Sequence, residues 1–407
     1  MDINLKKSTL KNNQSISISG SKSETNRLLL LQALYPELQL ENISDSDDSV
    51  TMRQCLQSTD VIKNVHHAGT AMRFLSAYYA MQENAEVILT GSSRMKERPI
   101  KILVDALQQL GANITYLEKE GFPSLKIVGK NLSKNQVTIN ANVSSQYISA
   151  LLLIGATLPN GIEIYLEGKL TSLPYIQMTL SVLNALGIKA DFSNNKLSVS
   201  AAKTLQNPHF VVESDWSSAS YFYSIVALSP VGSKVRLQSF KKNSLQGDAV
   251  LAEIYKDFGV KTTFEKDAVL LTKIKNPAEK HLNYDLNHSP DIAQTIIVSC
   301  LGLGITCDLS GLHTLKIKET DRLQALKNEL EKFGADVEIT QDSIHLKNAP
   351  TFSSETIAIE TYQDHRMAMA FAPLALKQEL IVKEAEVVSK SYPAFWNDLK
   401  ILGFCFC

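Results

Sequence analysis

The stretch LVDALQQLGANI (Leu103–Ile114) combines an apolar-periodic helix, a glycine and a β-like run. A glycine at this point is typical of a helix that ends in a left-handed residue, and the residues after it alternate as a strand does. The same phrase recurs four times along the chain. Its other copies are LSVLNALGIKA (Leu180–Ala190), LAEIYKDFGVKT (Leu251–Thr262), LKNELEKFGADVE (Leu326–Glu338) and the truncated DLKILGF (Asp398–Phe404). The chain therefore repeats a helix–glycine–strand unit.

The glycines of these copies are spaced at similar intervals. They are Gly111, Gly187, Gly259, Gly334 and Gly403, separated by 76, 72, 75 and 69 residues. A degenerate copy around Met52–Asp60 lacks the glycine. Six units of about 70 residues account for the whole chain, and each has room for two helices and several strands. We therefore expect an α/β protein of subdomains grouped around shared cores, although ordinary α/β proteins also end helices with glycine.

Composition limits the class of protein and its partners. The 407 residues can form two or three domains with full hydrophobic cores, and 44% apolar with 20% charged residues is ordinary for a soluble globular protein. The net charge of −1 favours neither nucleic acid nor a membrane surface as a partner. The polar start Met1–Leu10 has no signal-peptide core, and the longest apolar runs are too short to span a bilayer. We expect a cytoplasmic enzyme.

The five cysteines are expected to be free thiols in a reducing compartment. They are Cys55, Cys300, Cys307, Cys405 and Cys407, and they show no metal-like or CxxC spacing. Cys405 and Cys407 could bind a metal, but we expect them to lie in a loose tail.

SGSKSETNRLLLLQAL (Ser19–Leu34) has the features of an anion-binding helix start. Ser21 and Glu24 fit a capping box that begins a helix near Lys22. The free N–H groups and the helix dipole favour an anion there, and Ser23 and Arg27 share one face on which they can hold a phosphate. The alternative is a well-capped surface helix with solvated charges.

Similar helix starts recur four times. They are His67–Met81 with Gly69 before a Thr70 cap, Val143–Ala156 with Ser144, Ser145 and Gln146, Thr171–Leu180 with Ser172 ahead of Pro174, and Lys316–Gly334 with Lys318 and Glu319 before the first turn. Each alone is more often a cap than a ligand site, but together they favour several phosphate contacts.

Three basic clusters interrupt otherwise neutral surroundings: RMKERP (Arg94–Pro99), TYQDHRMAMAF (Thr361–Phe371) and SKSYP (Ser389–Pro393). The apolar run after Arg366 predicts a buried helix with charges at its start. A charge next to such a helix needs either an internal acid or a bound anion as its partner. These clusters suit a small substrate with several negative charges.

These motifs resemble, in order and spacing, those of the 5-enolpyruvylshikimate-3-phosphate synthase family of enolpyruvyl transferases. The segments that carry the resemblance are SGSKSETNR, AGTAMRFL, RMKERPI, VSSQY, NHSPDIA, KIKETDRL and YQDHRMAMAF, within Ser19 to Pro393. The resemblance implies two similar globular α/β domains, each of three βαβαββ units (an inverse α/β barrel), joined by a double crossover. The domains would be residues 20–212 and residues 1–19 plus 213–407, with the active site in the interdomain cleft.

The resemblance also implies the reaction and the residues that carry it out. The enolpyruvyl group of phosphoenolpyruvate would pass to the 5-hydroxyl of shikimate 3-phosphate, in a monomer without metal or other cofactor. Asp291 would be the base, Glu319 the proton donor, and Lys22 would touch both substrates. Shikimate 3-phosphate would bind to Lys22, Ser23, Arg27, Ser144, Ser145, Gln146, Ser172, Tyr175, Asp291 and Lys318. Phosphoenolpyruvate would bind to Lys22, Gly69, Arg94, Gln146, Arg322, Arg366 and Lys390.

The chain departs from the family pattern at three positions. His67, Phe74 and Thr314 stand where the family usually has Asn, Pro and Asn. We expect the first two to alter sensitivity to the inhibitor glyphosate. Two rival interpretations are the sister transferase that uses UDP-N-acetylglucosamine and an inactive phosphometabolite-binding protein. The first needs a reactive cysteine, whereas Cys55 is the one cysteine of residues 20–212 and lies away from any basic cluster. The second would have lost groups such as Asp291 and Glu319.

Overall fold

The computed structural model describes residues 1–140, 144–168 and 173–407. Contacts between Cα atoms divide the chain into two compact units, Gly20–Val212 and a second unit made of Met1–Ser19 with Glu213–Cys407. The chain therefore passes twice from one unit to the other. Among the helices described, none has the length and apolar character needed to cross a membrane.

One βαβαββ motif builds most of both units. Its first copy consists of β4 (Ile62–Asn64), α3 (Gly69–Met81), β5 (Glu86–Thr90), α5 (Lys101–Gln109), β6 (Asn113–Tyr116) and β7 (Leu125–Val128). Strands β4 and β5 pair in parallel on either side of α3 in the chain. Strands β6 and β7 form an antiparallel pair, and β7 lies next to β5, so that the sheet order is β4-β5-β7-β6.

Three further four-stranded sheets repeat this topology. The second copy in Gly20–Val212 is β8 (Gln136–Asn140), α6 (Ser145–Gly155), β9 (Ile162–Glu167), α7 (Leu173–Ala185), β10 (Ala190–Ser193) and β11 (Lys196–Val199). In the other unit one copy is β2 (Gln14–Ile16), α8 (Trp216–Leu228), β13 (Lys234–Gln238), α9 (Leu251–Asp257), β14 (Val260–Phe264) and β15 (Ala268–Lys273). The next copy is β16 (His281–Asp285), α10 (Ala293–Leu303), β17 (Thr306–Ser310), α11 (Arg322–Glu331), β18 (Val337–Ile339) and β19 (Ile344–Leu346).

The last two copies draw strands from distant parts of the chain. In one, β20 (Ile357–Ile359), α12 (His365–Phe371), β21 (Leu380–Val382) and α13 (Phe395–Ile401) are completed by β1 (Ile3–Leu5), which pairs antiparallel with β21. In the other, α1 (Lys22–Leu34), β3 (Gln39–Glu41) and α2 (Asp47–Gln57) are joined by β12 (His209–Val211), which pairs in parallel with β3. The six-unit α/β architecture expected from the sequence is confirmed, with two of the six sheets shortened.

The C-terminal segment is tied to the N-terminal strand. Lys6 donates its amide to the carbonyl of Cys405 at 2.9 Å, and the amide of Cys407 donates to Asn4 at 3.1 Å. Leu5 and Phe406 form an antiparallel bridge. The expectation of a loose tail at Cys405 and Cys407 was therefore wrong, because the repeat unit at this end needs the tail to meet the first strand.

The five repeat glycines follow helix ends and all adopt left-handed backbone angles. Their φ values are +102° for Gly111, +85° for Gly187, +75° for Gly259, +80° for Gly334 and +93° for Gly403. This conformation is costly for residues with a side chain and common for glycine. The predicted role of these glycines as helix stops is confirmed.

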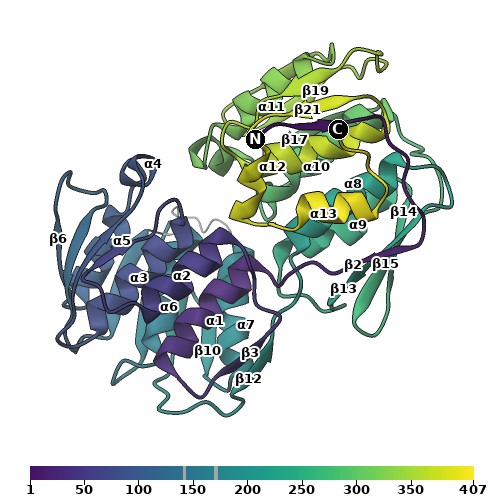
Figure 1. Ribbon diagram of the computed structural model, residues 1–407. Helices are drawn as coiled ribbons and strands as arrows, with labels where there is room; N and C mark the ends of the chain where they lie inside the picture. Colours follow the sequence, from purple (N-terminus) through teal and green to yellow (C-terminus); the bar gives the residue numbers. More distant parts are fainter. Residues whose placement is uncertain (141–143, 169–172) are drawn as a thin grey trace. The chain divides into compact units, whose positions relative to one another are not determined.

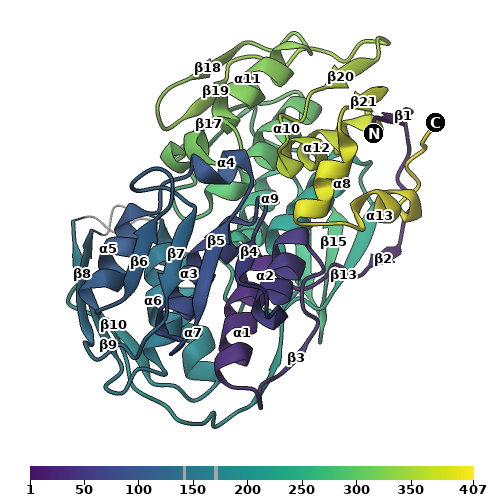
Figure 2. The same ribbon diagram turned by 60° about the vertical axis from the view of Figure 1, so that its left-hand side comes forward.

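Three helices in each unit are buried on nearly all sides. They are α1, α3 and α6 in Gly20–Val212 and α8, α10 and α12 in the other unit. Within each unit these helices lie on the inside and the strands lie around them (Figures 1 and 2). A helix that is apolar on all sides is stable only in such a core. Because the sequence motifs sit at the starts of these helices, the fold brings polar residues to the ends of an apolar core.

Candidate active site

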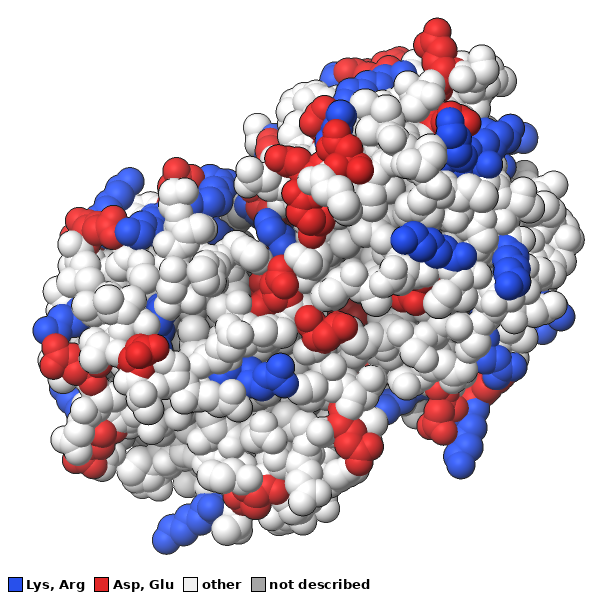
Figure 3. Space-filling view, viewed as in Figure 1, with Lys and Arg blue, Asp and Glu red and all other residues white. Residues whose placement is uncertain are grey.

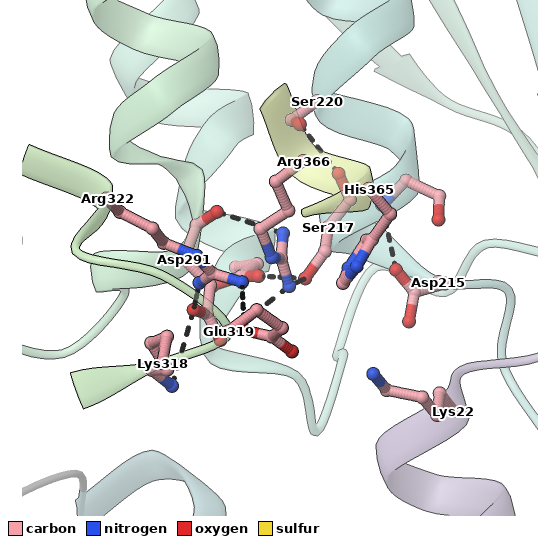
Figure 4. Close-up of polar contacts among 12 residues, drawn as sticks. Lys22, Asp215, Ser217, Ser220, Asp291, Lys318, Glu319, Arg322, His365 and Arg366 are labelled. Carbon is pink, nitrogen blue, oxygen red and sulfur yellow. Dashed lines mark hydrogen bonds and ion pairs between the residues drawn. The ribbon is translucent and has the colours of Figure 1, made fainter. Parts of the chain in front are cut away.

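Arg322, at the start of α11, is the centre of a network of carboxylates in the unit formed by residues 1–19 and 213–407. The residue is 2% exposed. Its Nε donates to Oδ2 of Asp364 at 2.6 Å. Nη1 donates to Oδ1 of Asp291 and Nη2 donates to Oε2 of Glu319, both at 2.8 Å (Figure 4). Burial opposes the charge of Arg322, but the carboxylates of Asp364, Glu319 and Asp291 outweigh burial and raise its pKa above the ordinary value.

Helix starts hold these carboxylates in place. Asp291 lies in the short 3₁₀ helix η2 (Pro290–Ile292) directly before α10. Asp364 is the N-cap of α12 and accepts a hydrogen bond from the amide of Arg366 at 2.9 Å. Glu319 lies three residues before Arg322, with the N-cap Asp321 between them. The acids are therefore fixed by main-chain structure as well as by the guanidinium.

Asp291 faces two further cations. Nζ of Lys318 lies 3.5 Å from Oδ1 of Asp291, and Nη2 of Arg366 lies 3.6 Å from its Oδ2. Nη1 of Arg366 also donates to the main-chain oxygen of Asp291 at 2.9 Å. The sequence left open whether Arg366 has an acid or an anion as its partner, and the structure places an internal acid beside it. Five residues expected to act on the substrates thus form one network: Asp291, Lys318, Glu319, Arg322 and Arg366.

Asp248 is a buried neighbour of this network to which the sequence assigned no role. It lies in η1 (Gly247–Val250), is 6% exposed and accepts a short hydrogen bond from the hydroxyl of Ser217. Burial, followed by the charge of Asp291, raises its pKa to about 6, while Arg366 acts in the opposite direction. Its motif LQGD was visible in the sequence, but burial next to Asp291 depends on the fold.

Lys390 contacts the loop that leads into α12. Its Nζ donates to the main-chain oxygen of Gln363 at 2.8 Å. Tyr362 and Gln363 have φ values of +52° and +55°, which are unfavourable for residues with side chains. Lys390 therefore contacts a strained turn that directly precedes Asp364 and Arg366.

Arg27 joins three helices of the Gly20–Val212 unit and is also 2% exposed. Its Nε donates to Oγ1 of Thr179 at 2.8 Å, and Nη1 donates to the main-chain oxygen of Ser23 at 2.6 Å. Nη2 donates to Oγ of Ser149 and to the main-chain oxygen of Tyr175, both at 3.1 Å. Burial lowers the pKa of Arg27 to about 10, and the charges of Tyr175 and Glu24 only partly offset it. Thr179 and Ser149 were missed in the sequence.

The other predicted residues of this unit lie at helix starts. Ser21 caps α1, and Nζ of Lys22 lies 3.6 Å from Oδ2 of Asp48. Ser144 is exposed and caps α6 by accepting the amide of Gln146 at 3.4 Å, whereas Ser145 is buried. Tyr175 is half-buried in the first turn of α7. Ser172 lies outside the described residues.

The start of α3 differs from the expectation. The N-cap is Ala68, with no side-chain hydrogen bond, and Gly69 is the first helical residue. The prediction that Thr70 caps this helix was therefore wrong, because Thr70 already lies inside its first turn and accepts a hydrogen bond from Nε2 of Gln146 at 3.0 Å. Arg94 lies in the short helix α4 (Ser93–Lys96), is more than half exposed and pairs with Glu97 at 2.8 Å.

Charged side chains of both signs are mixed on one face of the molecule. On the face seen in Figure 3, Lys and Arg are interspersed with Asp and Glu. Within the described part of the chain, no group of three or more His, Cys, Asp or Glu side chains is arranged to hold a metal ion.

Comparisons with known proteins agree with one another. The model of the family "EPSP synthase (3-phosphoshikimate 1-carboxyvinyltransferase)" matches residues 51–399. A 3-phosphoshikimate 1-carboxyvinyltransferase of Bacteroides fragilis (strain YCH46) is 43% identical over 392 residues, which cover 96% of this chain and 95% of that protein. The enzyme of the same name from Mannheimia haemolytica is 36% identical over 421 residues, covering 95% and 96%. The solved EPSP synthase of Acinetobacter baumannii shares the fold, with a TM-score of 0.81 at 20% identity over 100% of this chain and 99% of that one.

Proposed function

This chain belongs to the EPSP synthase (3-phosphoshikimate 1-carboxyvinyltransferase) family, and we propose which of its residues carry out the reaction of that family. The enzyme transfers the carboxyvinyl group of phosphoenolpyruvate to shikimate 3-phosphate, a step in aromatic amino acid biosynthesis. In our proposal the acceptor is the 5-hydroxyl group, and both units of the chain contribute residues to the reaction.

One observation carries the assignment of acid and base. The carboxylates of Asp291 and Glu319 accept hydrogen bonds from the two terminal nitrogens of the same buried guanidinium, that of Arg322. A shared, rigid donor holds a base and an acid at a fixed separation, which an addition–elimination requires. Lys318 and Arg366 lie beside Asp291 and place positive charge next to it.

In this mechanism the 5-hydroxyl oxygen attacks C2 of phosphoenolpyruvate while its proton passes to Asp291. Glu319 delivers a proton to the methylene carbon C3, because the vinyl group is a poor electrophile until it is protonated. The tetrahedral adduct then loses phosphate by cleavage of its C2–O bond. A methyl proton returns to the carboxylate of Glu319 at the same time, which restores the C2–C3 double bond of the carboxyvinyl group. Lys22 acts together with Asp291 and Glu319 because it places a positive charge next to both substrates.

The cations and helix starts bind the two substrates. Together the substrates carry two phosphates and two carboxylates, so fixed positive charges are needed to offset their repulsion. We assign shikimate 3-phosphate to Lys22, Ser23, Arg27, Ser144, Ser145, Gln146, Ser172, Tyr175, Asp291 and Lys318. We assign phosphoenolpyruvate to Lys22, Gly69, Arg94, Gln146, Arg322, Arg366 and Lys390. The hydrogen bonds of Arg27 go to protein oxygens, so within this set Arg27 acts on shikimate 3-phosphate through its positive charge and by orienting Ser23 and Tyr175.

The test is phosphate release from phosphoenolpyruvate, measured with and without shikimate 3-phosphate. Release that requires both compounds supports the proposal. Release from phosphoenolpyruvate alone would indicate a phosphatase, and release only with UDP-N-acetylglucosamine would indicate the sister transferase. Binding of both compounds without any release would indicate an inactive binding protein. We also propose, from the sequence resemblance, a monomer acting in the cytoplasm, and light scattering after gel filtration tests the first point.

A further inference from the structure

Cys405 and Cys407 lie in an ordered segment beside β1, where the sequence predicted a loose tail. The amide of Cys405 donates to Oγ of Ser8 at 2.9 Å, and its carbonyl oxygen accepts the amide of Lys6 at 2.9 Å. The amide of Cys407 donates to the carbonyl oxygen of Asn4 at 3.1 Å. The main chain is therefore held in place at both cysteines.

The two thiol groups lie on the same side of this segment. Leu5 and Phe406 are opposite each other in an antiparallel bridge, and the ring of Phe406 packs against that of Trp396 with centroids 6.2 Å apart. Side chains alternate along a strand, so those of Cys405 and Cys407 point away from the face on which Phe406 packs. Both cysteines are exposed to solvent, whereas the other three cysteines of the chain are buried.

The contacts of the two sulfur atoms are weak. Sγ of Cys405 lies 3.8 Å from the carbonyl oxygen of Gly403, and Sγ of Cys407 lies 3.8 Å from that of Asn4. A thiol is a weak hydrogen-bond donor, so each side chain can turn away from its carbonyl oxygen at small cost. The two sulfur atoms are therefore available to another ligand.

Lys6 places a positive charge near this pair of thiols. Its Nζ lies 3.0 Å from Oε2 of Glu379. The pKa of Lys6 is raised by its hydrogen bond to Glu379 and, to a smaller extent, by the charge of Cys407. A neighbouring cation favours the thiolate form of a cysteine, which is the form that binds metal ions.

Strand geometry disfavours a disulfide between these two cysteines. Residues two apart in an extended strand have Cα atoms about 6.6–6.8 Å apart, and their parallel Cβ atoms are separated by a similar distance. A disulfide requires Cβ atoms about 3.5–4.5 Å apart. Two thiolates that share a metal ion need only bring their sulfur atoms to about 4 Å. Staggered rotamers that lean toward each other allow this separation.

We propose that Cys405 and Cys407 bind one Cu(I) ion between their two sulfur atoms. Thiolates are soft ligands that select Cu(I), and Cu(I) is stable with two ligands, whereas Zn²⁺ usually takes four. Each thiol loses a proton on binding and no electron is transferred. The resulting complex carries one negative charge, which Lys6 partly offsets. None of these three residues has a role in the proposed reaction, so the inference does not depend on the proposed function.

The first experiment measures the affinity of the full chain for Cu(I) in competition with the chelator bicinchoninate, without oxygen. The wild type is expected to take up one equivalent of Cu(I). Cys405→Ser and Cys407→Ser should each bind about 100-fold more weakly or worse, because one thiolate cannot form the two-ligand complex. Cys55→Ser removes a buried thiol and should bind like the wild type. Equal affinities of the wild type, Cys405→Ser and Cys407→Ser would overturn the inference.

A second experiment distinguishes one chain from two chains as the source of the ligands. Light scattering after gel filtration should give the same mass before and after addition of one equivalent of Cu(I). X-ray absorption of the copper complex should show two sulfur ligands. A doubled mass would show that copper bridges two chains, and this result or a single sulfur ligand would contradict the proposed site.

Reaction with the thiol reagent DTNB identifies the groups that hold the ion. Two thiols of the native protein should react rapidly, and one equivalent of Cu(I) should protect both of them together. Protection of only one thiol would overturn the inference. Zn²⁺ tests the choice of metal, and binding of Zn²⁺ to the pair more tightly than Cu(I) would contradict that choice.

Discussion

Arg27 and Arg322 are equally buried, yet their surroundings differ. Each is 2% exposed, and each joins several segments of its own unit. The hydrogen bonds of Arg27 go to two hydroxyl groups and two main-chain oxygens, all of them neutral. Those of Arg322 go to three carboxylates. Burial accordingly lowers the pKa of Arg27 to about 10, whereas carboxylates raise that of Arg322.

This difference in hydrogen-bond acceptors distinguishes two functions that a buried cation can have. A guanidinium that is held by neutral oxygens keeps much of its positive charge available to an anion nearby. A guanidinium that is surrounded by carboxylates is neutralised, and its main effect is to fix those carboxylates in position. In our proposal Arg27 therefore supplies positive charge for binding, and Arg322, besides contacting phosphoenolpyruvate, holds the acids that transfer protons. The following predictions test this division.

The largest effect is expected for Asp291→Asn, which keeps the shape of the side chain and removes the base. The kcat should fall by about 10²- to 10⁴-fold, because general-base catalysis contributes about that much. Asp308→Asn, a change in a carboxylate on β17, is the control and should retain most of the wild-type rate. Steady-state phosphate release measures both. A kcat within 5-fold of wild type in Asp291→Asn would remove Asp291 from the mechanism.

The next largest effect is expected on the free energy of unfolding, for which we compare Arg322→Met with Arg27→Met. Arg322→Met leaves the buried Asp364 and the partly buried Asp291 and Glu319 without their cation and should lower the free energy of unfolding by about 3–5 kcal/mol. Arg27→Met leaves only neutral oxygens unpaired and should cost about 1–3 kcal/mol. Urea unfolding followed by fluorescence and circular dichroism gives both values. Equal losses, or a larger loss in Arg27→Met, would contradict this difference between the two arginines.

A pH-dependent effect is expected for Asp248→Asn. The pKa of Asp248 is raised from 3.8 to about 6 in the folded protein, so the unfolded chain loses this proton at lower pH than the folded one. Ionisation of Asp248 therefore reduces stability as the pH rises from about 4 to 6. Asn cannot ionise, so the variant should gain up to about 3 kcal/mol above pH 6 and little below pH 4.

The control variant for this pH dependence is Asp308→Asn, whose stability relative to the wild type should change with pH in the opposite direction. A hydrogen bond from His345 lowers the pKa of Asp308, so its ionised form stabilises the folded state. Asp308→Asn should thus lose stability at neutral pH relative to acid pH. Urea midpoints at several pH values check both trends. A gain for Asp248→Asn that does not depend on pH would show that burial of its charge is not the cause.

The smallest effect is expected on stability when a methyl group is added at Gly20 or Gly69 in the Gly20–Val212 unit. At Gly69 the methyl group would meet the end of the Arg98 side chain, whereas at Gly20 it would meet a main-chain carbonyl group. A methyl group on Gly20 would lie 1.8 Å from the main-chain oxygen of Asn42 and 2.8 Å from Cγ1 of Val212. Gly20→Ala should therefore cost about 1–2 kcal/mol of stability, because the backbone must shift. Gly69→Ala meets only the end of Arg98 and should cost less. Thermal melting ranks the two variants, and the reverse order would indicate that Arg98 is rigidly held.

Local patterns in the sequence predicted the helix starts and stops. Ser21 caps its helix as expected, Ser144 lies at the start of α6 as expected, and the repeat glycines are all left-handed. These features depend on residues that are only a few positions apart, so they can be predicted from the spacing of residue types in the sequence. The wrong prediction for Thr70 also came from local spacing. A glycine can begin a helix without any side-chain cap, and spacing alone does not show which residue is the first of the helix.

Partners distant in the sequence could not be predicted in this way. Thr179 lies 152 residues from Arg27, and Asp364 lies 42 residues from Arg322, yet both are hydrogen-bonded to those arginines. Asp248 lies in the segment LQGD (Leu245–Asp248), and nothing local in this segment indicates that it is buried beside Asp291. The position of Arg98 on Gly69 is also decided by packing between separate segments.

The sequence by itself determined the repeat, the ends of its helices, and the residues that can carry charge or protons, because these properties depend on residue type and short-range spacing. Tertiary structure alone decided that carboxylates balance the charge of Arg322 and that neutral oxygens surround the charge of Arg27. The physical reason is that the electrostatic effect of a side chain depends on burial and on charges within a few ångströms, and those neighbours come from distant parts of the chain.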